Sequence, residues 1–237
     1  MGRVFEKRKY KMFARYDRMA KQFTRLGKEI VIAVKQAGPY PDGNPRLRAA
    51  MQTAKGLNMP KDRIEAAIQR ASNKLEGNFE ELVYEGYAPF GVAVLCEAAT
   101  DSNNRTVANI RSYFTKAEGS LGKTGSLDFI FTRKGVFKLK ADGINTDDLE
   151  LELIDHGLED LLIDEEENQV IIHTAFTDYS TMQKALENLK VEVLSSELQR
   201  FANTFVELTE EQEEIVMKLI EKMEQDEDIQ NVYHNIK

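Results

Sequence analysis

Apolar positions in the first part of the chain recur at helical spacing. In residues 16–37, seven apolar side chains lie three or four positions apart and fall within an arc of about 100° on a helical wheel. Five Lys and Arg side chains fall within a second arc of about 100°, nearly opposite the first. Because Gly38 and Pro39 end the pattern, we predict one helix with a buried face and a basic stripe. The stripe consists of Arg18, Lys21, Arg25, Lys28 and Lys35.

Two shorter amphipathic helices are predicted after this stop. Asn44 is a preferred helix-capping residue, and Pro45 suits the first helical position. Gly56 is a typical terminator for that helix, and a third helix is expected from about residue 60 to residue 74. Three amphipathic helices joined by short links predict a small helical bundle.

Beyond residue 77 the pattern changes to alternating strands and helices. Runs rich in β-branched and aromatic residues predict strands, and stretches with helical periodicity predict helices between them. We therefore predict a multidomain α+β protein, with an N-terminal three-helix bundle followed by two small α+β domains of ferredoxin-like type. The expected strands are 81–87, 92–98, 127–133, 136–140, 159–163, 169–175, 191–195 and 229–236, and the expected helices are 104–117, 146–156, 178–189 and 210–225.

Charge is distributed unevenly along the 237 residues, although the net charge is only -8. Residues 1–74 contain 18 Lys and Arg against 6 Asp and Glu, whereas residues 141–237 contain 6 against 26. Residues 75–140 are balanced at 8 against 8. This asymmetry is typical of a protein that binds a polyanion at one end, because the acidic part repels phosphate.

The basic N-terminal part is the main candidate for a binding site. Like charges on a small bundle repel one another, and a bound phosphate chain would relieve that repulsion and release counterions. We therefore predict that this part binds nucleic acid; an anionic partner protein or a merely solvated charged face are the alternatives. Nothing in the pattern distinguishes DNA from RNA. The predicted contact residues are Arg3, Lys7, Arg8, Lys9, Lys11, Arg15, Arg18, Lys21, Arg25, Lys28, Arg46, Arg48, Lys55, Lys61 and Arg63.

Residues 1–15 form a basic arm ahead of the first predicted helix. Such an arm can be disordered alone and order when it binds. Tyr10 and Phe13 lie among its charges, where they would either stack on bases or pack against the protein.

Three other segments resemble sites but fit structural roles better. Residues 117–124 are one glycine short of a phosphate-binding loop and follow a predicted helix rather than a strand, so a helix-to-strand connection is expected. Residues 164–168 are acidic but lack the ligand spacing of a calcium loop, so a hairpin turn is expected. Residues 100–106 suit a strand-to-helix junction, with a polar contact surface as the alternative.

Catalytic and metal chemistry find little support in the sequence. The three histidines are far apart, and no Cys and His residues have metal-ligand spacing. The single cysteine, Cys96, lies in an apolar run and is expected to be buried. A membrane-spanning helix needs about 20 consecutive apolar residues, and no apolar stretch of the sequence approaches that length. We therefore expect a cytoplasmic protein that is not an enzyme and needs no cofactor or metal.

Several motifs resemble the YebC/PmpR family over nearly the whole chain. They are residues 44–50 (NPRLRAA), 58–62 (NMPKD), 84–93 (YEGYAPFGVA), 104–106 (NRT), 121–122 (LG) and 125–126 (GS). The chain departs from the family at its opening, Met1–Phe5, where members usually have Gly-His-Ser-Lys-Trp, and at Phe90, where many have glycine.

This resemblance implies both a domain organisation and a function. The domains would be 1–76, a discontinuous 77–140 plus 203–237, and an inserted acidic 141–202. Members are described as DNA-binding transcriptional regulators, and others, including a mitochondrial translational activator, as ribosome-associated factors. The first role is our leading prediction, and a translation factor that binds rRNA or tRNA and relieves stalled translation is the alternative. In the translation role, the loop with Tyr87 and Pro89 or the corner with Asn104 and Arg105 is the candidate functional loop.

Overall fold

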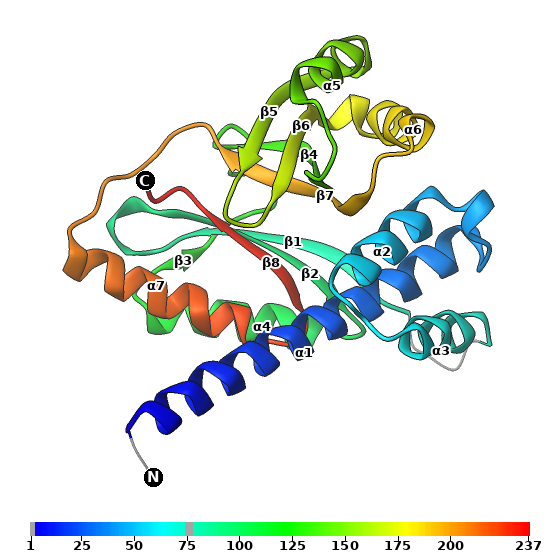
Figure 1. Ribbon diagram of the computed structural model, residues 1–237. Coiled ribbons are helices and arrows are strands. Elements are labelled where there is room, and N and C mark those ends of the chain that lie inside the picture. Colours follow the sequence, from blue (N-terminus) through cyan, green and yellow to red (C-terminus); the bar gives the residue numbers. More distant parts are fainter. Residues whose placement is uncertain (1–2, 74–77) are drawn as a thin grey trace.

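Three helices form the N-terminal unit of the computed structural model, which describes residues 3–73 and 78–237, with side chains from Met19 onward (Figure 1). Helix α1 spans Arg3–Ala37, α2 spans Pro45–Gly56 and α3 spans Lys61–Ser72. The predicted helices are confirmed, and α1 begins earlier than expected because the segment predicted as an arm continues the same helix. The side chains of that segment lie outside the described residues.

Local contacts at Asn44 explain where α2 begins. The side-chain oxygen of Asn44 accepts a hydrogen bond from the backbone N–H of Leu47 at 3.0 Å, which is the predicted cap. Its Nδ2 donates to the carbonyl oxygens of Ala33 and Gly38 on the end of α1. Asn44 therefore joins two helices, and behind it the apolar faces of all three form one core that includes Ile30 and Ala67.

The first sheet has the strand order β3-β1-β2-β8 and is antiparallel throughout. One face is buried beneath α4 and α7, where Phe114 and Met223 pack against the strands. Helix α7 starts with the predicted capping box of Thr209 and Gln212. The elements are β1 Glu80–Tyr87, β2 Ala93–Thr100, α4 Asn103–Lys116, β3 Ser120–Leu121, α7 Glu210–Glu224 and β8 Ile229–His234.

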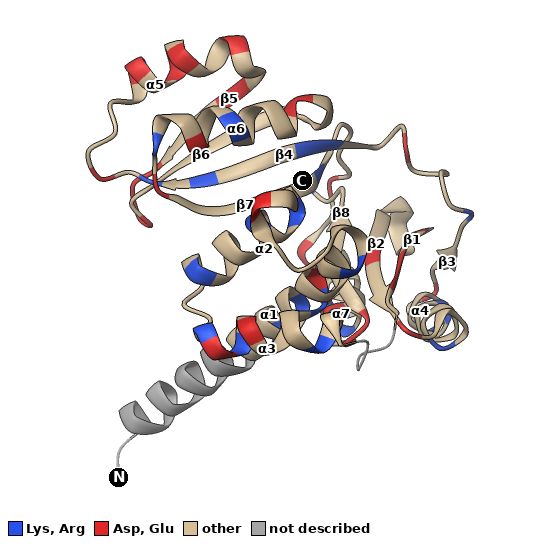
Figure 2. Ribbon diagram, turned by 90° about the vertical axis from the view of Figure 1, so that its right-hand side faces the viewer, with Lys and Arg blue, Asp and Glu red and all other residues tan. Residues whose placement is uncertain are grey.

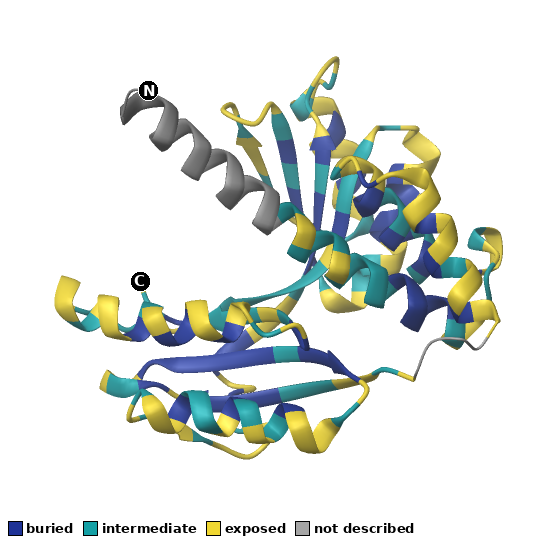
Figure 3. Cartoon of the chain, turned by 90° about the horizontal axis from the view of Figure 1, so that it is seen from below, coloured by how far each residue is buried: buried dark blue, intermediate teal, exposed yellow. Residues whose placement is uncertain are grey.

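The second sheet has the strand order β5-β6-β4-β7, also antiparallel. Its chain order, strand-helix-strand-strand-helix-strand, is the ferredoxin-like arrangement. The elements are β4 Phe131–Lys140, α5 Thr146–Leu153, β5 Leu158–Asp164, β6 Gln169–Ala175, α6 Tyr179–Leu189 and β7 Val193–Ala202. Short 3-10 helices span Pro41–Gly43, Pro89–Gly91, Ile154–His156 and Phe176–Asp178. Buried residues lie on the strands and on the inward sides of the helices (Figure 3).

The structure corrects the prediction between residues 127 and 140. The two strands expected there are one strand, β4, preceded by a turn in which Leu127 and Ile130 pack against the first sheet. Strand β4 pairs with β6 and β7, so it belongs to the second sheet rather than to the 77–140 unit. Apolar alternation predicted a strand here, but its pairing partners lie 29 or more residues further along the chain.

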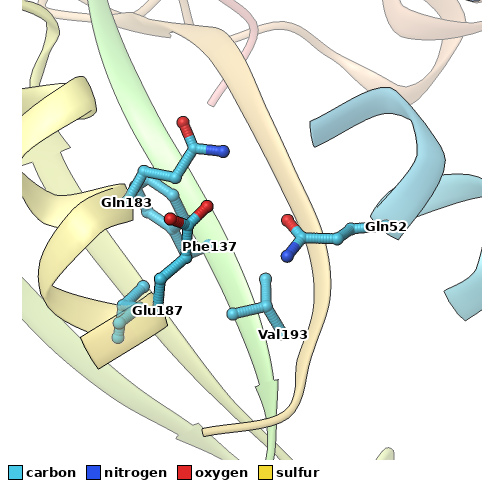
Figure 4. A pocket seen from close by; sticks show the side chains of 6 residues that line it. Gln52, Phe137, Gln183, Glu187 and Val193 are labelled. Carbon is cyan, nitrogen blue, oxygen red and sulfur yellow. The ribbon is translucent and has the colours of Figure 1, made fainter. Parts of the chain in front are cut away.

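Helix α2 connects the N-terminal unit to the second sheet. The Cα of Gly56 lies against the backbone of Leu194 in β7, so closely that a Cβ would overlap the Leu194 carbonyl oxygen. The backbone N–H of Ser196 donates to the hydroxyl of Thr53 at 3.3 Å. Beside this contact is a narrow seam where Gln52 of α2 faces Gln183 of α6 (Figure 4). Among the described residues, Nε2 of the buried Gln183 has no hydrogen-bond partner.

Phe90 adopts a backbone conformation that favours glycine. Its φ is 64° and its ψ is 18°, in the left-handed region. An L residue with a Cβ is strained there by about 1 kcal/mol. The strain gives a physical reason why many members of the family that the sequence resembles have glycine at this position. The side chain of Phe90 is 46% exposed.

Replacing Gly56 with alanine should weaken the attachment of α2 to β7. The added Cβ must displace backbone rather than a flexible side chain, which costs about 2 kcal/mol. Urea unfolding measures the change. The matched control is Gly27→Ala in α1, where a Cβ meets no atom within 4 Å and the helix should gain about 0.5 kcal/mol. Equal effects of the two substitutions would contradict the contact.

Replacing Phe90 with glycine should stabilise the protein by about 0.5 kcal/mol, because relief of left-handed strain exceeds the added freedom of the unfolded chain. The measurement is the thermal midpoint. Phe129, which is 70% exposed and has no positive φ, is the control, and its replacement by glycine should destabilise by a similar amount. Destabilisation by Phe90→Gly would show that its side-chain contacts outweigh the strain.

Candidate nucleic-acid interface

Lys28 of the predicted basic stripe points into the molecule. Its Nζ donates to the carbonyl oxygens of Ala99 at 3.0 Å and Glu227 at 2.6 Å, and lies 3.3 Å from Oδ1 of Asp228. The side chain is only 12% exposed. A cation with three acceptors from its own chain is not available to a phosphate, so we assign Lys28 to the contact between α1 and the first sheet.

Asp228 is the centre of this contact. Besides Lys28, its carboxylate accepts hydrogen bonds from Thr106 Oγ1 at 2.9 Å and from Arg105 Nη2 at 2.8 Å, and the side chain is 8% exposed. Burial alone would raise the pKa of Asp228, but the donors Arg105 and Thr106 and the charge of Lys28 hold the pKa below its ordinary value. No local sequence pattern indicated a role for Asp228, because its partners come from segments more than 100 residues away.

Arg46 and Arg48 of α2 are also held by carboxylates of this chain. Arg46 Nε lies 2.6 Å from Glu29 of α1, and its Nη1 lies 2.9 Å from Glu81 of β1. Hydrogen bonding to Arg46 is the main cause of the lowered pKa of Glu81. Arg48 Nε pairs with Glu187 of α6 at 3.3 Å. Lys28 and Arg46 therefore join the helical unit to the first sheet, and Arg48 joins it to helix α6, which packs on the second sheet.

Two more predicted contacts of the basic stripe, Arg25 and Lys21, have described side chains. Arg25 is half-buried and donates to the carbonyl oxygen of Glu224 at the end of α7, and burial lowers its pKa. Lys21 is also half-buried. The predicted contacts at Arg3, Lys7, Arg8, Lys9, Lys11, Arg15 and Arg18 concern side chains outside the described residues. They remain predictions.

Three predicted contact residues remain exposed at the junction of α2 and α3. Lys55 ends α2 and makes no ion pair with a described residue. Lys61 opens α3 with a side chain 88% exposed and a loose 3.4 Å pair with Glu65. Arg63 lies two residues further along α3, with its guanidinium 5.8 Å from the ring centre of Phe23. Figure 2 shows Lys and Arg on α2 and α3, well apart from the acidic α5.

The four candidate functional-loop residues do not come together. Tyr87 and Pro89 lie at the β1–β2 turn, whereas Asn104 and Arg105 lie at the start of α4. Strand β2, with 8 residues, separates the two places, which corresponds to about 25 Å. Arg105 is part of the Asp228 network, so the 100–106 segment forms the predicted strand-to-helix junction and also a contact within the chain.

A cleft of about 440 Å³ opens beside this network. Lys28, Phe79 and Arg105 line it together with four carboxylates. Those carboxylates belong to Asp101, Asp226, Glu227 and Asp228. Acidic groups outnumber cations here, so the cleft does not suit a phosphate chain.

The Gly-rich segment that resembles a phosphate loop is followed by a turn that holds an internal carboxylate. Helix α4 ends at Lys116 and β3 begins at Ser120, which is the predicted helix-to-strand order. The backbone N–H groups of Gly125 and Leu127 donate to the buried Glu85 at 2.8 Å and 2.6 Å. These donors are thus already satisfied by an anion of the chain itself.

Other chemistry is sparse in the described part of the molecule. Among those residues no three His, Cys, Asp or Glu side chains are arranged to hold a metal ion. Cys96 is buried as predicted, and burial raises the pKa of its thiol to about 12. None of the helices formed by the described residues combines the length and apolar character that crossing a membrane requires.

Comparison with known proteins gives consistent matches over the whole chain. A family model described as the TACO1/YebC protein N-terminal domain matches residues 3–74, and one described as the TACO1/YebC second and third domain matches residues 79–236. A probable transcriptional regulatory protein of Cytophaga hutchinsonii is 55% identical, covering 100% of this chain and 98% of its own. One from Flavobacterium johnsoniae is 52% identical, covering 100% and 99%.

A solved structure shares the fold. The crystal structure of a conserved hypothetical protein from Aquifex aeolicus superimposes with a TM-score of 0.78 at 38% sequence identity. The match covers 92% of this chain and 90% of that one.

Replacing Asp228 with asparagine should destabilise the protein by about 3 kcal/mol, because Lys28 would stay buried without its counter-charge. Urea unfolding at neutral pH measures the loss. Because the folded pKa of Asp228 is lowered, its contribution is present above the ordinary carboxyl pKa and is lost as pH falls through the folded value. Parent and variant should therefore converge in acid.

The control for this variant is Glu214→Gln, which removes an exposed pair with Lys218. It should change the free energy of unfolding far less than Asp228→Asn does, because both charges are exposed to solvent. If Asp228→Asn were as mild as this control, the network around Asp228 would not hold α1 in place.

Proposed function

Because this chain belongs to the TACO1/YebC family, we propose that it is a regulator of gene expression that binds nucleic acid through its N-terminal helical unit. The relatives named as probable transcriptional regulatory proteins support regulation of transcription as the first choice. We further propose that it acts in the cytoplasm by binding and not by catalysis.

The observation that carries this proposal is the exposed cation group at the α2–α3 junction, formed by Lys55, Lys61 and Arg63. Lys28, Arg46 and Arg48 form pairs inside the molecule. Among the described side chains, the predicted contacts that are exposed to solvent are therefore Lys55, Lys61 and Arg63. Exposed Lys and Arg near one another attract a phosphate backbone and release its counterions. The internal pairs fix the orientation of that group relative to both sheets.

DNA is the proposed target, and ribosomal RNA or tRNA is the alternative. The junction group supplies point charges and one guanidinium at helix ends, which suits contact with backbone phosphates more than reading of base edges. Such contacts fit either polymer. A translation role on the ribosome therefore remains the second candidate, and the two are separated by experiment.

Replacing Lys55, Lys61 and Arg63 together with glutamine should weaken binding to a 30-base-pair DNA duplex without changing the fold. Each lost phosphate contact lowers the salt slope of log K by about one, so the triple variant should lose about three. Fluorescence anisotropy of labelled duplex at several salt concentrations measures both quantities, and circular dichroism checks the fold.

A variant with the same charge change elsewhere is the control. Lys184, Lys218 and Lys222 are exposed on other elements, and their replacement by glutamine should leave the salt slope unchanged. Equal losses in the two triple variants would mean that only net charge matters, and the junction group would not be the contact surface.

Parallel assays separate the two targets. A transcriptional regulator should protect one promoter in footprinting with excess random DNA present. A translation factor should instead bind an rRNA hairpin more tightly than the duplex and sediment with ribosomes, and the junction variant should lose that co-sedimentation.

A further inference from the structure

The outer edge of the second sheet combines exposed aliphatic side chains with unpaired acids. Strand β5 is an edge strand, because its described neighbour is β6 on one side. Leu162 and Ile163 of β5 are 50% and 58% exposed. On the adjoining helix α5 and the turn after it, Leu151 and Ile154 are 70% and 54% exposed. We call these four residues and the carboxylates around them the α5–β5 surface.

Exposure of both Leu162 and Ile163 follows from their place at an open edge. Successive residues of a strand point to opposite faces, so these two side chains flank the edge above and below. Ile163 is opposite Val170 and Leu162 is opposite Ile171 in β6, and no strand formed by the described residues pairs with the outer side of β5. A further strand alongside β5 would cover both side chains and pair with the free backbone groups of the edge.

Carboxylates surround this edge, and most of them make no ion pair with a described residue. Residues 146–167 contain 11 Asp and Glu and no Lys or Arg. Within the described part of the chain, Glu159 of this segment pairs with Lys134, and Asp160 lies 3.7 Å from His173. Asp148 and Asp164 accept hydrogen bonds from the Asn145 side chain and the Glu167 backbone N–H. Figure 2 shows the acidic positions along α5.

Acids next to an open edge can act simply as protection against aggregation. That role does not require exposed aliphatic residues on the edge strand and on the outer side of the adjoining helix as well. An interface that combines apolar side chains with charge of one sign selects a partner with apolar side chains and the opposite charge. Phosphate chains are repelled by it.

We propose that the α5–β5 surface binds an extended, Lys- and Arg-rich segment of a partner protein, which adds a strand to β5. The segment would alternate basic residues with aliphatic ones, the aliphatic side chains covering Leu162 or Ile163 and the cations meeting the acids of α5 and of the β5–β6 turn. This site is separate from the nucleic-acid interface, so either proposal can fail without the other.

Hydrogen exchange on the full-length protein tests strand addition directly. The probe is a capped ten-residue peptide of alternating lysine and valine, in excess. Backbone amides of β5 should exchange at least tenfold more slowly when the probe is bound, because the edge N–H groups gain partners. A lysine–serine peptide of equal charge should protect them far less.

Two variants locate the binding. Leu162→Ser combined with Ile163→Ser should weaken probe binding about tenfold while leaving the fold intact, because both side chains are half or more exposed. Ile215→Ser is the matched control: Ile215 is 45% exposed beside the acidic first turn of α7, and its replacement should leave binding unchanged.

Three results would overturn the proposal. The lysine–serine peptide could bind equally well, which would mean that charge by itself accounts for the binding. Protection could fall on α7 as much as on β5. Sedimentation could reveal self-association that the Leu162→Ser, Ile163→Ser variant abolishes, and the occupant would then be a second copy of this chain. A photo-crosslinker at Leu151 that captures a basic strand segment of another protein in cells would support the proposal.

Discussion

A buried carboxylate at Asp228 needs cations and hydroxyl donors around it, and meeting that need brings the parts of the molecule together. Leaving this group charged away from water would cost several kcal/mol without partners. Lys28 comes from α1, while Arg105 and Thr106 come from the start of α4. The position of α1 against the first sheet is therefore set by the pairing of charges at one end of β8.

Pairing with carboxylates and carbonyl oxygens of the same chain divides the basic residues of the N-terminal part into two groups. Lys28, Arg46 and Arg48 form the bonds between the helical unit and the sheets, and their positive charge is used within the chain. Lys55, Lys61 and Arg63 face solvent at the α2–α3 junction. In our proposal the excess of positive charge in the N-terminal part thus serves both assembly of the chain and binding of nucleic acid. A count of charges along the sequence cannot separate the two uses.

Negative charge is divided in a similar way. Glu85 is buried and accepts hydrogen bonds from the backbone of the 125–127 turn, so it organises a loop. Glu81 and Glu187 hold arginines of α2. The carboxylates of α5, by contrast, face solvent beside an open strand edge, where they determine which partners can approach. Burial and the presence of a cation nearby decide which of these roles a carboxylate has.

The sequence by itself determined the local elements, because periodicity and capping act over a few residues. The Asn44 cap, the Thr209 and Gln212 capping box, and most helices and strands followed from such patterns. The family was also evident from its motifs. Only the tertiary structure decided which sheet β4 joins, that Lys28 is buried, and that Tyr87 and Arg105 lie at opposite ends of β2. Those outcomes depend on contacts between residues 29 to 200 positions apart, such as Lys28 with Asp228, and no local pattern encodes them.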